Sequence, residues 1–166
     1  GLLFDGPGQG SMLYEHGVPL RPDWEVVIKA VVDFAEALPL VDPARIALSG
    51  WSLGGYLAPR AASGEPRIAA LVADPGLWGI AEGFREMAVR AFGAPREAVA
   101  DLGTLDQAVI DRMDAFIRGD RRLDCPKTLL HFRAAEGAAG HCEMGNRSLL
   151  NGRVLDWLDE QFGMDR

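Results

Sequence analysis

Residues 45–55 read RIALSGWSLGG, and the fold can be worked out from this stretch outward. The apolar run at 45–49 predicts a buried strand, residues 50–54 predict a sharp turn, and a helix is predicted from there to about Ala62. The turn fits the pattern G-x-S-x-G, in which a strand leads into a helix and holds a serine hydroxyl clear of the backbone. The pattern therefore predicts that Ser52 is a nucleophile.

Short apolar runs alternate with helical periodicities along the rest of the chain. Further strands are predicted at 2–4, 68–73 and 127–132, and further helices at 22–38 and 148–162. Short, fully apolar strands that alternate with helices are typical of a parallel sheet with helices on both faces. The predicted fold class is therefore α/β.

One long segment interrupts this alternation. Residues 79–118 have a helical pattern, and we interpret 79–122 as a helical, lid-like insertion over the carboxyl edge of the sheet. The insertion belongs to a single predicted domain that spans residues 1–166, because no linker or repeat divides the chain.

Charge and composition narrow the classes of function. The 166 residues carry a formal net charge of −7, and acidic and basic residues are interspersed without a basic stripe that could neutralise phosphates. No apolar run approaches the roughly 18–20 residues needed to cross a bilayer, and the start GLLFDGPG lacks the basic region of a signal peptide. We expect neither nucleic acid nor a membrane as a partner.

The two cysteines predict no metal site. Cys125 and Cys142 form neither a C-x-x-C pair nor a zinc-ligand spacing. Reduced thiols of this kind are typical of a reducing compartment, so the expected location is cytoplasmic.

Ser52 needs a base, and in proteins with this elbow the chain order is serine, then acid, then histidine. Three histidines are present. His16 precedes the serine, and His131 falls inside a predicted strand, where a core or edge position is expected. His141 follows the last predicted strand in a loop rich in Gly and Ala, so it is the predicted base.

The acid is less clearly marked. Asp74 ends a predicted strand at the carboxyl edge, where sites form in parallel sheets, so it could orient His141 and stabilise its protonated form. The alternative is that Asp74 only caps a turn. Weaker candidates for the acid are Glu82, Asp120, Asp124 and Glu136.

The remaining parts of the predicted site are a hydrogen-bond donor for the oxyanion and a pocket for the substrate. The backbone N–H of Leu53 is the expected first donor of an oxyanion hole, and the N-terminus of the following helix favours developing negative charge. Trp51 and Trp78 could line an acyl or aromatic pocket, although aromatic side chains more often serve in packing.

Several motifs together resemble a known family. They are FDGPGQG at 4–10, RPDWE at 21–25, GWSLGG at 50–55 and EGAAGHCE at 136–143. In this order they resemble a group of α/β-hydrolases that includes dihydroxypseudooxynicotine hydrolase, polyketide-shortening hydrolases, and esterase-like and dipeptidyl-peptidase-like relatives. The resemblance implies that Ser52 is the nucleophile and His141 the base. It also implies a small carbonyl substrate (an ester, an amide or an activated carbon–carbon bond) and no metal or organic cofactor.

The chain departs from this family in two places. The resemblance implies an N-terminal region with the first strands of the sheet and a second oxyanion donor, and the chain begins after it. At 124–128 the start of the acid-bearing strand runs directly into what resembles the final strand, so the triad Asp and its surroundings are expected to be missing. We therefore expect a partial α/β-hydrolase fold, whose open sheet edge favours association with copies of itself.

Two functional hypotheses follow. The first is a serine hydrolase that works through an acyl-enzyme, with Ser52 as nucleophile and His141 as base. The alternative is a truncated, catalytically impaired hydrolase-like domain that acts as a binding or dimerising module. The elbow and the C-terminal histidine favour the first hypothesis, whereas the fused junction at 124–128 favours the second.

Overall fold

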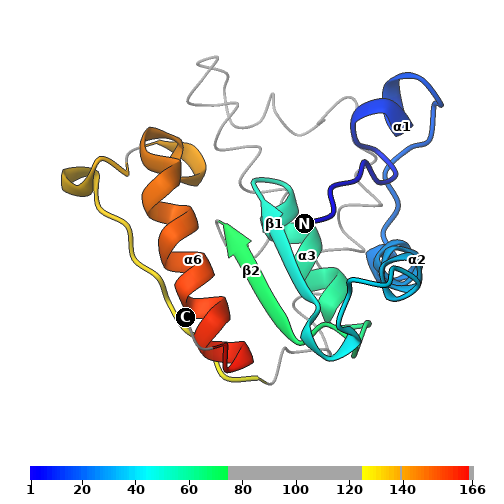
Figure 1. The fold of residues 1–166 in the computed structure, drawn as a ribbon. Coiled ribbons are helices and arrows are strands. Elements are labelled where there is room, and N and C mark those ends of the chain that lie inside the picture. The colour runs from blue at the N-terminus through cyan, green and yellow to red at the C-terminus, as the bar shows by residue number, and fades with distance from the viewer. Residues whose placement is uncertain (75–124, 139, 165–166) are drawn as a thin grey trace, which may run out of the picture.

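The computed structural model of the chain describes residues 1–74, 125–138 and 140–164. The elements run in the order α1 (Gly10–Tyr14), α2 (Trp24–Glu36), the 3₁₀ turn η1 (Pro43–Arg45), β1 (Ala47–Trp51), α3 (Gly54–Ala62), β2 (Ala70–Asp74), the 3₁₀ turns η3 (Ala134–Glu136) and η4 (His141–Asn146), and α6 (Arg147–Phe162) (Figure 1). The insertion expected at 79–122 lies outside the described residues.

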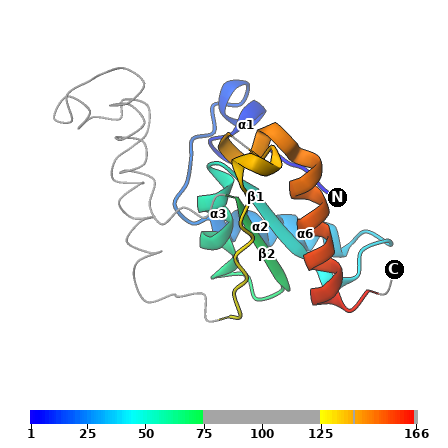
Figure 2. The ribbon, with the colours of Figure 1, turned by 90° about the vertical axis from the view of Figure 1, so that its left-hand side faces the viewer.

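The strands β1 and β2 form a parallel pair. Ala47 lies opposite Ala70, and Trp51 lies opposite Asp74, so both strands end at the same edge. In both views the pair lies between α3 on one side and α6 on the other (Figures 1 and 2). The predicted parallel sheet with a helix on each face is therefore present in the part of the chain that the structure describes.

The core lies between α2, α3 and the sheet. Trp24, Ile28 and Val32 recur every four residues along α2, and they form one buried cluster with Tyr56, Leu57 and Ala61 of α3. This spacing places the three α2 side chains on one face of the helix. The helix predicted at 22–38 is confirmed, with Trp24 and Glu36 as its observed ends.

Two predicted strands are absent from the observed fold. Residues 2–4 and 127–132 have an extended or irregular backbone without sheet pairing. Leu3 is 96% exposed and Leu129 is 91% exposed, whereas Leu130 and Phe132 of the second run are half-buried. The prediction was wrong because a strand needs a hydrogen-bonded neighbour, which an apolar run does not supply by itself.

The strand before the elbow begins later than the sequence predicts. Asp42 accepts a hydrogen bond from the N–H of Ala44 and caps η1, so β1 starts at Ala47 instead of residue 45. The strand ends at Trp51, directly before Ser52.

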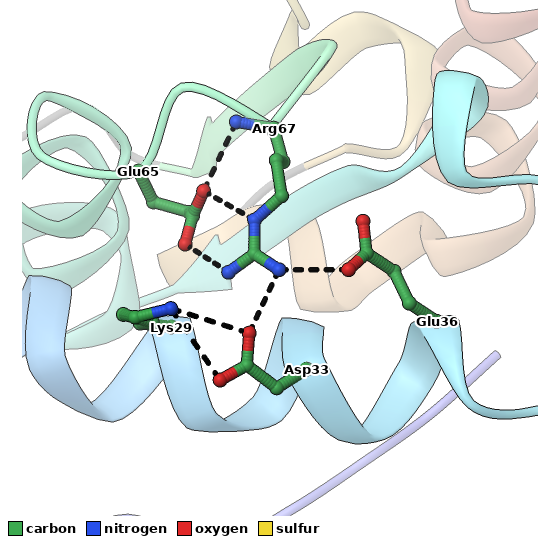
Figure 3. A network of polar contacts seen from close by, with 5 residues as sticks. All are labelled: Lys29, Asp33, Glu36, Glu65 and Arg67. Atoms are coloured by element: carbon green, nitrogen blue, oxygen red, sulfur yellow. Dashed lines mark hydrogen bonds and ion pairs between the residues drawn. The ribbon is translucent and has the colours of Figure 1, made fainter.

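An ion-pair cluster joins α2 to the loop between α3 and β2 (Figure 3). Arg67 donates to both carboxylate oxygens of Glu65, at 2.8 and 2.6 Å. Its Nη1 also donates to Asp33 at 2.7 Å and to Glu36 at 2.8 Å, and Lys29 approaches Asp33 at 3.4 Å. We call these five residues the Arg67 cluster. Its ion pairs hold the segment before β2 against α2, the helix that packs on α3.

The cysteines and the apolar character of the helices also bear on the expectations from composition. Cys125 is exposed and Cys142 is buried, and both are free thiols. Within the described ranges, no helix has the length and apolar character that spanning a membrane requires.

Candidate active site

The turn at 50–54 has the backbone geometry that an exposed serine requires. Ser52 lies between the end of β1 and the start of α3, and its φ is 56°. Few residues other than glycine adopt this left-handed conformation, which costs about 1–3 kcal/mol and is kept only where surrounding contacts hold it. Here the N–H of Ser52 donates to the carbonyl oxygen of Asp74 at 2.8 Å. The serine is thereby tied to the end of β2.

The two motif glycines have different surroundings. A Cβ on Gly50 would lie 1.9 Å from the carbonyl oxygen of Gly54 and 2.7 Å from the Cβ of Ala58, so α3 can pack on β1 only where no side chain is present. A Cβ on Gly54 would meet none of the described residues within 4 Å. Close packing therefore explains the first glycine of the motif.

His141 is the histidine that the fold brings to Ser52. Its Nε2 lies 2.8 Å from the Oγ of Ser52, although the two residues are 89 positions apart. His16 lies in the turn after α1, and His131 lies in the irregular segment before η3. Both of these side chains are exposed, so the expected core or edge position of His131 is not observed.

The segment that carries His141 has an unusual backbone. Cys142 and Glu143 have φ values of 52° and 50°, both in the left-handed region. The Cys142 thiol donates to the carbonyl oxygen of Asp74 at 3.2 Å, and burial raises the pKa of this thiol. The carbonyl oxygen of Asp74 thus accepts hydrogen bonds from both the Ser52 backbone and the segment of His141.

The carboxyl group of Asp74 is buried beside Arg147. Asp74 is 8% exposed, and its Oδ2 is 3.5 Å from the Nη1 of Arg147. Burial, followed by a hydrogen bond to Asp74, raises the pKa of Glu143. Asp74 Oδ2 and Glu143 Oε2 are both buried without a hydrogen-bond donor among the described residues.

Among the described residues, no carboxylate accepts a hydrogen bond from His141, whose Nε2 contacts Ser52 Oγ. The predicted orientation of His141 by Asp74 therefore stays a prediction. Glu136 is bonded to the guanidinium of Arg153 and to the N–H of Arg133, which commits it to local structure around η3. The other acid candidates, Glu82, Asp120 and Asp124, lie outside the described residues.

Two charged residues near Asp74 and His141 are not identified from the sequence, and they are Glu143 and Arg147. Glu143 stands two positions after His141 in the motif GHCE, and this proximity was the available signal. Arg147 donates to the carbonyl oxygen of Cys142 at 2.6 Å, and its guanidinium lies over the ring of Trp51 at 3.9 Å from the centroid. No sequence pattern marks Arg147, because its contacts depend on where α6 lies relative to β1.

The other predicted parts of the site have the following positions. Leu53 is the N-cap of α3, and no acceptor for its N–H lies within the described part of the chain. Trp51 is 54% exposed with Arg147 over one ring face, and Trp78 lies outside the described residues. Within 1–74, 125–138 and 140–164, no three His, Cys, Asp or Glu side chains gather in a way that could hold a metal ion.

Comparison with known proteins adds a family and several relatives. A family model described as "Alpha/beta hydrolase family" matches residues 1–159. "Hydrolase ORFZ" of Pyricularia oryzae is 53% identical over 81 residues, which cover 45% of this chain and 19% of that protein. "Alpha/beta hydrolase ucsC" of an Acremonium species is 57% identical over 81 residues, covering 45% and 16%. "Hydrolyase ccsE" of Aspergillus clavatus is 46% identical over 80 residues, covering 45% and 18%. Each match spans less than a fifth of the relative.

Proposed function

The chain belongs to the alpha/beta hydrolase family, and on this premise we propose that it is a serine hydrolase. Its proposed substrate is a small molecule with an ester, an amide or an activated carbon–carbon bond beside a carbonyl group. The observation that carries the proposal is the 2.8 Å contact between Ser52 Oγ and His141 Nε2, at a serine whose backbone is left-handed. The relatives described above are named as hydrolases, which supports the same class of reaction.

The mechanism uses three groups of the chain. Ser52 Oγ attacks the carbonyl carbon while His141 Nε2 takes the hydroxyl proton. The N–H of Leu53 donates to the oxygen that becomes negative in the tetrahedral intermediate. The leaving group departs with the proton from His141, and an acyl group remains on Ser52. Water, activated by His141, then attacks the acyl group, and the proton returns to Ser52.

We further propose Asp74 as the acid that supports His141. It lies at the end of β2, and its carbonyl oxygen already joins the backbone of Ser52 to the thiol of Cys142. A triad acid holds the imidazole in the productive tautomer, and its loss costs on the order of 10⁴ in rate. Substitution of Asp74 by Asn should therefore slow acylation strongly if Asp74 has this role.

A second candidate function is a binding or dimerising module without efficient catalysis. Two observations favour it. No carboxylate of the described residues is bonded to His141, and Leu3, Leu40 and Leu129 are almost fully exposed. Exposed apolar side chains of this size favour association, including with copies of the same chain. We also propose a cytoplasmic location, which the two free cysteines support.

Covalent labelling separates the two functions. We expect a fluorophosphonate probe to modify the parent chain at Ser52, as mapped by mass spectrometry, and to leave Ser52→Ala unmodified. Ser49→Ala is the matched control, because Ser49 is an exposed serine of β1, three residues before Ser52. Failure of a folded parent chain to react would exclude the hydrolase mechanism and favour the binding module. Equal labelling of the parent and Ser52→Ala would show that another group is the nucleophile.

A further inference from the structure

Arg147 makes three contacts with parts of the chain that surround the candidate site. Its Nη1 donates to the carbonyl oxygen of Cys142 at 2.6 Å and lies 3.5 Å from the Oδ2 of Asp74. Its guanidinium lies 3.9 Å from the centre of the Trp51 ring. The side chain is only 21% exposed, so these contacts are largely protected from water.

Each of the three contact partners is either adjacent in sequence or hydrogen-bonded to Ser52 or His141. Trp51 immediately precedes Ser52, and Asp74 accepts the hydrogen bond of the Ser52 backbone. Cys142 immediately follows His141. One side chain, at the start of α6, therefore holds the segment of the histidine against the ends of both strands.

The left-handed backbone of the segment that carries His141 needs stabilising contacts from other parts of the chain. Cys142 and Glu143 are consecutive left-handed residues, a conformation that side chains disfavour and that persists only where surrounding contacts impose it. The bond from Arg147 fixes the carbonyl oxygen of the first of these residues. Without it, the segment could relax to an ordinary backbone conformation and carry His141 away from Ser52.

We propose that Arg147 is the positioning residue that holds His141 within hydrogen-bonding distance of Ser52. The proposal rests on the serine hydrolase function proposed above, and it adds a residue that does not touch the reacting atoms. An arginine suits this position because its planar guanidinium can stack on an aromatic ring while its edge donates hydrogen bonds. A lysine would keep the charge beside Asp74 but would lose the stacking geometry.

The first test measures position without activity. In a ¹⁵N-labelled chain, the imidazole signals of His141 are assigned by their loss in His141→Asn. Ser52→Ala should shift these signals in the parent chain, because it removes the 2.8 Å contact. In Arg147→Met the same Ser52→Ala change should leave them unmoved. Arg147→Lys should give an intermediate shift.

The matched control is Arg153→Met. Arg153 lies on the same helix, pairs with Glu136, and has its guanidinium over Phe132 at 5.1 Å, away from Ser52. Its loss removes a similar ion pair and a similar aromatic contact. We expect Ser52→Ala to shift the His141 signals in this background as it does in the parent.

The second test measures reactivity. Arg147→Met should lower the rate of fluorophosphonate labelling roughly 10²-fold, as expected for a misplaced base, and should lower kcat for a chromogenic ester with little change in KM. Added guanidinium ion should restore part of the rate in Arg147→Ala. Arg153→Met should react within about twofold of the parent.

The outcomes separate the two proposals. If the parent is labelled and the Arg147 variants keep both the His141 shift and the labelling rate, the positioning role is wrong and the hydrolase function stands. If the parent is not labelled but the shift depends on Arg147, the positioning role stands and the hydrolase function fails. If Arg147→Met does not fold, Arg147→Lys and Arg147→Gln provide the same comparison, and a parent-like shift in both contradicts the positioning role.

Discussion

At the scale of single residues, the elbow depends on the space beside Gly50. Gly50→Ala should destabilise the chain by about 3 kcal/mol or more, because a Cβ would lie 1.9 Å from the Gly54 carbonyl oxygen of α3. Gly54→Ala is the matched control, since its Cβ would meet none of the described residues, and it should change stability by less than about 1 kcal/mol. Urea unfolding measures both. Equal stability of the two variants would contradict the packing argument.

A second prediction at this scale concerns Glu143 and pH. Burial and the hydrogen bond to Asp74 raise the pKa of Glu143, so the folded chain keeps its proton to a higher pH than the unfolded chain. Stability is therefore lost as pH rises from the ordinary carboxyl value through the folded pKa. Glu143→Gln cannot ionise, so it should be more stable than the parent near pH 7.5 and equal to it near pH 4.

The groups that face Glu143 are Asp74 of β2, Arg147 of α6 and His141. Arg147 and a charged His141 oppose the rise in the pKa, because cations favour the ionised carboxylate. The check is the melting temperature of parent and Glu143→Gln at both pH values. A constant difference between them would mean that Glu143 does not titrate differently in the folded chain.

At the scale of elements, the Arg67 cluster joins α2 to the start of β2. Glu65 is 4% exposed, and both of its oxygens accept hydrogen bonds from Arg67 (Figure 3). Glu65→Gln keeps the shape but loses the charge, so it should cost about 1–3 kcal/mol. Asp33→Asn is the matched control, because Asp33 is half exposed and its pairing with Arg67 is screened by water, and it should change the melting temperature little.

The same pair predicts a pH dependence of the opposite sign to that of Glu143. The hydrogen bond from Arg67 lowers the pKa of Glu65, so its stabilisation is present above the ordinary carboxyl pKa and is lost as pH falls through the folded value. In Glu65→Gln the acid side of the stability curve should be flatter than in the parent. A parallel curve would contradict this role of Arg67.

At the scale of the whole molecule, the two helices that enclose the sheet are not equally buried. In α3, Tyr56 and Ala61 are fully buried and Leu57 is 2% exposed, whereas Leu150 is the one buried residue of α6 within the described chain. Amide hydrogen exchange should therefore be slower in α3 than in α6. Mass spectrometry of peptides from both helices measures the difference. Equal protection would mean that α6 opens only together with the core.

This difference in burial bears on the candidate site. Ser52 belongs to the well-buried unit of β1, α3 and β2, while His141 reaches it from η4, at the start of α6. Local opening of α6 would separate the two residues without unfolding the core. The contacts of Arg147 with Trp51 and Asp74 lie at this junction, which is why a single side chain there can matter to the arrangement.

Elements whose signals are local can be predicted from the sequence. The four-residue spacing of apolar side chains predicts α2 and its buried face, and G-x-S-x-G between an apolar run and a helix predicts the turn at Ser52. Chain order singled out His141 from three histidines. Such features depend on neighbours within a few positions, and these neighbours are visible in the sequence.

The contacts between groups far apart in the sequence depend on how the folded elements pack, that is, on the tertiary structure. It left residues 2–4 and 127–132 outside the sheet, because an apolar run becomes a strand only beside a hydrogen-bonding partner. It placed His141 2.8 Å from Ser52, and it brought Asp74, Glu143 and Arg147 close to one another from three separate elements. Contacts of this kind depend on the packing of α6 against β2, and no local sequence pattern encodes that packing.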